Sequence, residues 1–212
     1  MEKTRTIRTW GSFLLLLLLL FVFLIWNVLA GSVKLPVSEI LEILRGRGDG
    51  TQSRILLQIR LPRLLSALIL GGALSVSGYL LQTFFHNPIA GPFVLGISSG
   101  AKLCVSIVMI LLLSRGLVSS SAALIAAAFV GAMGSMGFVL AVSQKVKRMS
   151  LLVICGVMIG YICTAATDLL VTFADDSNIV NLHNWSMGSF SGMSWENVGT
   201  MAIVCGAALV LV

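Results

Sequence analysis

Side chains able to perform acid–base, nucleophilic or metal chemistry are scarce in this 212-residue sequence. Its two histidines, His86 and His183, lie far apart, and neither has a second ligand at the spacing of a metal site. Residues 91–96 come nearest to a phosphate-binding loop, but Ile97 stands where such a loop needs a lysine. We therefore predict no catalytic residues, no metal site and no bound cofactor, and we do not expect an enzyme.

Cysteines and charges also occur inside apolar stretches. A cysteine in that setting is typical of a small core side chain rather than of a disulfide framework or a metal cluster. The four cysteines are Cys104, Cys155, Cys163 and Cys205. Lys102 would cost about 2.5–3.5 kcal/mol at the centre of a bilayer, so it predicts a polar neighbour or an aqueous path. Asp168 lies nearer the end of its stretch, which favours an interfacial position. A coupled Lys102–Asp168 pair would instead indicate an ion-coupled transporter.

The elements that hold these residues are expected to be membrane-spanning helices. Hydrophobic residues make up 58% of the chain and charged residues only 10%, against about 25% charged in soluble domains. Of six apolar runs, the first five reach the roughly 20 residues that a spanning helix needs. The runs are residues 10–30, 64–85, 93–113, 120–142, 151–173 and 198–212. We predict an all-α, polytopic transmembrane bundle, one domain over residues 1–212, in a chain that ends within its sixth helix.

The first apolar run has an alternative interpretation as a cleaved secretory signal. Lys3, Arg5 and Arg8 precede a leucine block that ends in small residues. Because residues 12–30 exceed the core of about 7–15 residues typical of a signal, an uncleaved helix is favoured. Lysines and arginines divide almost evenly between the two sides, so they do not fix the orientation. With the N-terminus in the cytoplasm, residues 31–62 and 175–196 would be extracytoplasmic and residues 144–150 cytoplasmic.

The loop of residues 31–62 is rich in arginine. Apolar residues at positions 37, 40, 41 and 44 have helical spacing, which predicts a short amphipathic helix at the membrane interface. Residues 46–53 follow as a flexible turn, and Pro62 is expected in the first turn of the second spanning helix. Arg60 and Arg63 lie three positions apart and so close to one face of that helix. As an interfacial pair they would contact lipid phosphates.

Prolines mark the junction between the second and third helices. Asn87-Pro88 is expected to end the second helix, because proline disfavours helical geometry in the residue before it. Pro92 would restart a helix, and Gly96 and Gly100 would allow close contact along its first turns. Further small residues in the second, fourth and fifth runs extend this pattern. The spacing predicts a tightly packed bundle without identifying its purpose.

These segments resemble, in the same order, the signature of FecCD-type permeases, the membrane subunits of ABC importers for iron-siderophores, haem and cobalamin. The resemblance covers nearly the whole chain. Residues 151–157 are similar to the family's fifth helix, and residues 184–192 followed by Trp195 are similar to its W-x-x-G-S-F/L segment. The matching positions between residues 60 and 101 include two arginines and a helix-packing motif: Arg60, Arg63, Gly71, Gly72, Gly78, Gln82, Asn87, Pro88, Pro92, Gly96 and Gly100.

The resemblance implies a particular assembly in the cell membrane. Each subunit would hold about ten helices, of which about six lie in this chain. A second permease subunit would complete a homodimer or a heterodimer within the lipid bilayer. Cytoplasmic ABC ATPases would hydrolyse ATP, an extracytoplasmic binding protein would deliver the substrate, and no nucleic acid would be bound. In this family the segment that couples permease to ATPase follows the sixth helix, so the chain would end before it.

Three groups of site residues follow from the resemblance. Arg60 and Arg63 would dock acidic residues of the binding protein, because a guanidinium can bind a carboxylate through two hydrogen bonds. The cytoplasmic gate would comprise Arg148, Met149 and Ser150. The extracytoplasmic gate segment would border the translocation path with Met187, Gly188, Ser189, Phe190 and Gly192. The sequence does not identify the substrate, and an ion-coupled secondary transporter and a non-transporting scaffold subunit are the alternative functions.

Overall fold

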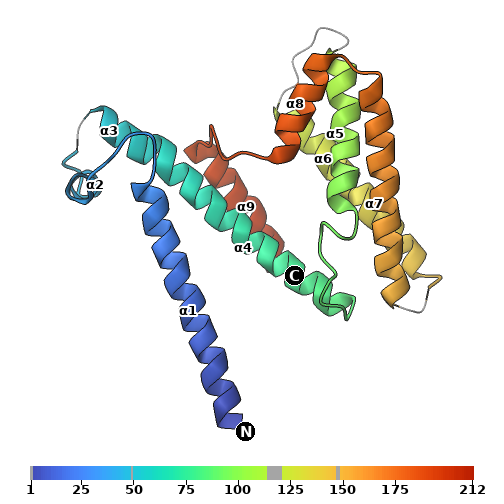
Figure 1. Ribbon diagram of the computed structural model, residues 1–212, viewed down its shortest axis with the longest axis horizontal. Helices are drawn as coiled ribbons and strands as arrows, with labels where there is room; N and C mark the ends of the chain where they lie inside the picture. Colours follow the sequence, from blue (N-terminus) through green and yellow to red (C-terminus); the bar gives the residue numbers. More distant parts are fainter. Residues whose placement is uncertain (1, 49, 114–120, 147–148) are drawn as a thin grey trace. The chain divides into compact units, whose positions relative to one another are not determined.

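The computed structural model describes residues 2–48, 50–113, 121–146 and 149–212, and every regular element in these ranges is helical (Figure 1). This confirms the predicted all-α class. The elements are α1 (Glu2–Leu29), α2 (Val37–Leu44), α3 (Thr51–Arg54), the π-helical segment η1 (Ile55–Arg60), α4 (Leu61–Phe84), α5 (Ile97–Leu113), α6 (Ser121–Ser143), α7 (Met149–Thr172), α8 (Asp176–Met187) and α9 (Trp195–Leu211).

Four helical stretches among the described residues are long and apolar enough to cross a membrane. They are Thr6–Leu29, Thr51–Phe84, Ser121–Ser143 and Ser150–Thr172, and α5 and α9 are shorter apolar helices of 17 residues each. The second stretch joins α3, η1 and α4 into one helix of 34 residues. Together these elements form the polytopic helical bundle that the composition predicts.

The third apolar run contains a shorter helix than expected. Residues 93–96 form turns, and α5 begins at Ile97 rather than at Pro92. Gly96 has a φ of +72°, which is outside the helical region and is open to glycine at no steric cost. The expectation that Pro92 restarts the helix is therefore wrong, because the left-handed turn at Gly96 separates this proline from α5.

The contacts divide the chain into two compact units, Met1–Gly72 with Phe190–Val212, and Ala73–Ser189. In the second unit α5, α6 and α7 pack against one another, and α8 lies against α5 (Figure 1). One apolar cluster lies where α5 begins, and it contains Phe85, Ala90, Leu95, Val139, Leu152 and Val153. A second cluster lies further along α5, and it contains Val105, Met109, Ala127 and Leu182.

Small residues bring the backbones of the second unit together between these clusters. A Cβ added to Gly100 of α5 would lie 2.6 Å from the Gly131 carbonyl oxygen of α6 and would also strike Ser135. A Cβ on Gly96 would lie 2.7 Å from the Gly156 carbonyl oxygen of α7. Such approaches are possible only without side chains, and they supply dispersion contacts where lipid provides no hydrophobic drive between helices.

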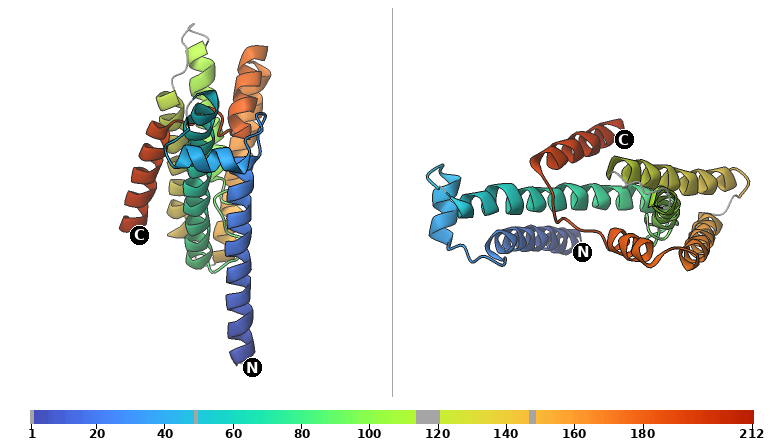
Figure 2. Two further views of the ribbon diagram at one scale, coloured as in Figure 1. Left: turned by 90° about the vertical axis from the view of Figure 1, so that its left-hand side faces the viewer. Right: turned by 90° about the horizontal axis from the view of Figure 1, so that it is seen from above.

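In the first unit α2 is the predicted amphipathic helix. Its residues Ile40 and Ile43 are buried in a cluster with Leu35 and Leu56, while Glu42 is exposed and Glu39 is partly exposed. Figure 2 shows α2 lying across the direction of α1. This short crosswise helix joins the end of α1 to the beginning of the long helix that contains η1.

Candidate functional site

The π-helical turn η1 ends two residues before Pro62, which lies inside the 34-residue helix and not in its first turn as expected. The Leu61 amide donates to the Leu56 carbonyl, five residues back instead of the four of an α-helix. The next residue, Pro62, has no N–H to donate. The Leu57 carbonyl is therefore left without its usual main-chain donor, and the Trp195 indole Nε1 donates to it at 2.8 Å.

Arg60, the last residue of η1, is buried, with only 7% of its surface exposed. Its Nη1 donates to the carbonyls of Val28 at 2.5 Å and Leu29 at 3.3 Å, and its Nη2 donates to the Val33 carbonyl. These are main-chain groups at and just beyond the end of α1. The docking role of Arg60 stays a prediction, but in this chain its guanidinium is already engaged by main-chain carbonyls.

Arg63 is placed differently from Arg60. It is exposed, lies one turn further along the helix, and lines an open pocket of about 490 Å³. The pocket walls include Asn27 and Ser32 from the end of α1 and the loop after it, and Ile59 from η1. Among the described residues Arg63 has no hydrogen-bond or ion-pair partner, so its guanidinium is open to an external anion.

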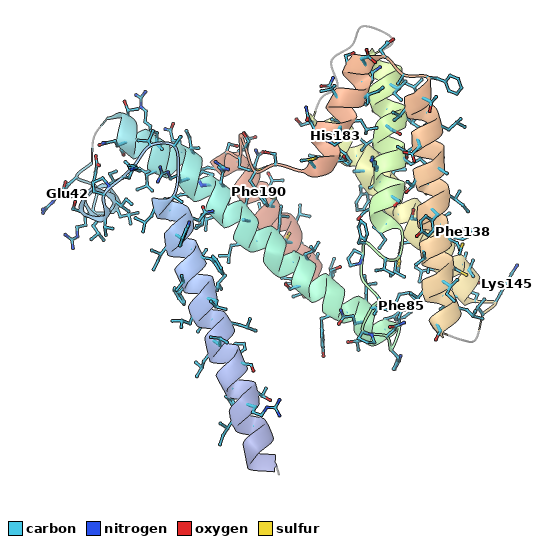
Figure 3. The ribbon with its side chains drawn as sticks, viewed as in Figure 1. Glu42, Phe85, Phe138, Lys145, His183 and Phe190 are labelled. Carbon is cyan, nitrogen blue, oxygen red and sulfur yellow. The ribbon has the colours of Figure 1, made fainter. Side chains whose placement is uncertain are left out.

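The predicted extracytoplasmic gate segment consists of α8 and the linker that follows it. Asn178 and Leu182 are the buried residues of α8 and seat it on its unit. Gly188 ends the helix with φ 71° and ψ 149°, a conformation open almost only to glycine. Figure 3 shows Phe190 in the linker and His183 on α8. Met187, Ser189 and Phe190 are exposed, and Gly192 has a φ of 82°.

The remaining predicted site residues are only partly described. Arg148 lies outside the described residues, Met149 begins α7, and Ser150 is exposed in the first turn of that helix. A Cβ on Gly71, Gly72 or Gly78 would meet nothing within 4 Å, so their packing role stays a prediction. Asn87 accepts a hydrogen bond from the Ile89 amide at 3.1 Å, as expected for an Asx turn that ends a helix. Gln82 is exposed, and Pro88 and Pro92 lie in the connection before α5.

The described residues do not form a chemical site of another kind. No group of three or more histidine, cysteine, aspartate or glutamate residues is placed to hold a metal ion within these ranges. Lys102 lies on α5 and Asp168 lies on α7. Among the described residues, neither side chain makes a hydrogen bond or an ion pair. Four side-chain hydrogen bonds between distant parts of the chain meet at Leu57, Arg60 and Trp195, which we call the joint.

The sequence does not predict this joint, although it contains one signal for it. A proline following eleven helical residues removes one N–H from the helix and obliges the chain to satisfy a carbonyl in another way. Trp195 belongs to a segment singled out above, but its partner is 138 residues away in the sequence. No periodicity of either segment predicts that pairing.

Comparison with known proteins gives concordant matches. The model of the FecCD transport family matches residues 17–212. Hemin transport system permease protein HmuU of Yersinia pestis is 35% identical over 145 residues, which is 68% of this chain and 43% of that protein. Vitamin B12 import system permease protein BtuC of Klebsiella pneumoniae is 35% identical over 199 residues, which is 94% of this chain and 56% of that protein.

One solved structure is also similar. It is an ABC transporter of the metal-chelate type in an inward-facing conformation, with a TM-score of 0.69 and 28% sequence identity. The match covers 86% of this chain and 55% of that chain. The chain thus spans about half the length of the proteins it matches.

Proposed function

Because the chain belongs to the FecCD transport family, we propose that it is a membrane-spanning permease subunit of an ATP-driven importer. The family match over residues 17–212 carries this proposal. The substrate class proposed is a metal chelate such as haem, cobalamin or an iron-siderophore. Two relatives named for hemin and vitamin B12 transport support the first two members of that class.

The chain is an integral membrane protein of the permease type, with apolar helices that require a bilayer. We place it in the cell membrane. ATP hydrolysis is assigned to separate cytoplasmic ABC ATPases, since its relatives are permease proteins. A second permease subunit and an extracytoplasmic binding protein complete the proposed assembly, in which Met187, Gly188, Ser189, Phe190 and Gly192 border the outer path.

Uptake in cells tests the proposal directly. The full-length transporter would be expressed with its ATPase and binding protein in cells that lack their own uptake systems. We expect accumulation of at least one of labelled haem, cobalamin and ferric siderophore. Accumulation should stop when the ATPase is inactivated by mutation and should persist in the presence of a protonophore.

The same experiment separates the alternative functions. Uptake that depends on the protonophore and not on the ATPase would indicate an ion-coupled secondary transporter. Assembly without uptake of any member of the substrate class would favour a scaffold subunit. A catalytically inactive ATPase that still binds the permease is the matched control, because it removes hydrolysis and leaves the complex intact.

A further inference from the structure

Arg60 supplies the charge that the end of α1 lacks. The last four carbonyls of a helix have no intrahelical partner, and they carry the negative end of the helix dipole. No basic residue lies in the last turn of α1. The Arg60 guanidinium lies against that turn instead and binds the carbonyls of Val28 and Leu29. It therefore acts as a C-terminal cap delivered from a different helix.

Gly31 makes room for this cap. A Cβ at position 31 would lie 2.5 Å from Nη2 and 2.9 Å from Cζ of Arg60. These atoms cannot retreat without breaking their bonds to main-chain carbonyls. An arginine suits the position because its planar fork reaches several acceptors at once, which a lysine ammonium cannot do in the same geometry.

Trp195 fixes the other side of the same helix. Its indole satisfies the Leu57 carbonyl that Pro62 leaves without a main-chain donor. Trp195 also begins α9, so this bond ties the start of α9 to η1. Leu57, Arg60 and Arg63 follow one another at intervals of three residues. Two anchored positions thus precede the exposed Arg63 by one and two turns.

We propose that Arg60 and Trp195 are positioning residues, which hold the outer end of the long helix between α1 and α9 and thereby set the place of Arg63. This inference rests on the proposed function and on the role that the family resemblance gives Arg63, which is to dock the binding protein. It assigns the two arginines of the pair different tasks. Arg60 contacts no partner protein, and its loss acts through the geometry of Arg63.

The distance test uses spin labels in the full-length transporter freed of its native cysteines, with one labelled subunit per complex. Labels at exposed positions 23 and 68 report on α1 and α4, and labels at 68 and 204 report on α4 and α9. Arg60→Gln and Gly31→Ala should broaden the first distance distribution, and Trp195→Phe should broaden the second. Trp26→Phe is the matched control, because the Trp26 side chain is exposed and its indole makes no hydrogen bond among the described residues.

The functional test measures association of the binding protein. Arg60→Gln should slow association roughly tenfold, as Arg63→Gln should. Unchanged distances in Arg60→Gln and Trp195→Phe would overturn the joint. Broadened distances with normal association would overturn the positioning role. If Arg60→Gln does not assemble, Gly31→Ala and Trp195→Phe carry both tests.

Failure of the proposed function has a different signature. A transporter that takes up no metal chelate would still give the distance distributions, and these decide whether the joint exists. Conversely, normal uptake together with unaltered distances in all three variants would contradict the joint and leave the permease assignment untouched.

Discussion

Arg63 is the residue on which the proposed docking depends, because it is exposed and its guanidinium is unpaired among the described residues. Exposed ion pairs contribute only about 0–1 kcal/mol each, so its effect belongs to orientation and association rate rather than to affinity. Arg63→Glu in the full-length transporter should slow association of the binding protein, most strongly at low salt. Stopped-flow association at several salt concentrations measures this. An acid-to-base change on the binding protein should partly restore the rate. Normal association kinetics of Arg63→Glu at low salt would contradict docking and favour contact of Arg63 with lipid phosphates.

Gly100 shows how little room the packed helices leave. Gly100→Ala would drive a methyl group into the Gly131 carbonyl and Ser135, so α5 and α6 must separate. Overpacking of this kind costs about 1–3 kcal/mol. We expect a lower melting temperature of the detergent-solubilised transporter, measured by fluorescence-detected size-exclusion chromatography after heating. Gly137→Ala is the control, because a Cβ there meets nothing within 4 Å, and equal melting temperatures for both variants would contradict the close contact.

Among elements, α8 and its linker carry the proposed outer gate. Gly188 lies in open space, so a side chain there would meet no obstacle. Its φ of 71° and ψ of 149° are nevertheless strained for any other residue, and a residue with a side chain would hold them at a cost of about 1–3 kcal/mol. Gly188→Leu should therefore redirect the linker and lower uptake while assembly with the ATPase is retained. Uptake and co-purification are the measurements. Gly199→Ala, within α9 and also in open space, should leave both unchanged, and unaltered uptake in Gly188→Leu would make the segment only an anchor.

The elements differ in how far the sequence predicts them. The spacing of apolar residues predicts α2, and the lengths of the apolar runs predict the spanning helices α1, α6 and α7. The second spanning helix begins at Thr51, within the predicted turn of residues 46–53, rather than around Pro62. The sequence also misplaces the start of α5, since the left-handed turn at Gly96 depends on the approach of Gly156 and Gly160 from another helix. The sequence does not predict the π turn for a related reason. The Leu57 carbonyl in this turn accepts its hydrogen bond from Trp195, a residue far away in the sequence.

At the scale of the whole molecule, the predicted cytoplasmic gate lies where two permease subunits meet, either two copies or two related chains. Met149 and Ser150 begin α7, and the proposal brings them close to their equivalents in the second subunit. Cysteines at 149 or 150, in a transporter without native cysteines, should cross-link between subunits in at least one nucleotide state. Cysteines at Tyr161, an exposed residue in the middle of α7, serve as the control. Absence of a cross-link in every state would remove the gate assignment.

For the candidate site, the sequence predicts which segments take part but not how their side chains are arranged. Family motifs locate the arginines, the α7 start and the α8 linker along the chain. They treat Arg60 and Arg63 as equivalent, and the structure separates them because Arg60 is buried against the end of α1 while Arg63 is exposed in the pocket beside it. Which side of a helix a residue occupies follows from local geometry around Pro62, and that geometry depends on tertiary partners.

The π turn changes the direction in which side chains point along the long helix. An α-helix advances by about 100° per residue, and a π turn accommodates one residue more than the α-helical path would need. Side chains before and after η1 are therefore out of phase by about a quarter of a revolution. Deleting a single residue between Ile55 and Arg60 would restore a common phase. It would swing α3 and the loop before it around the helix axis, so that α2 approached α1 from a different side.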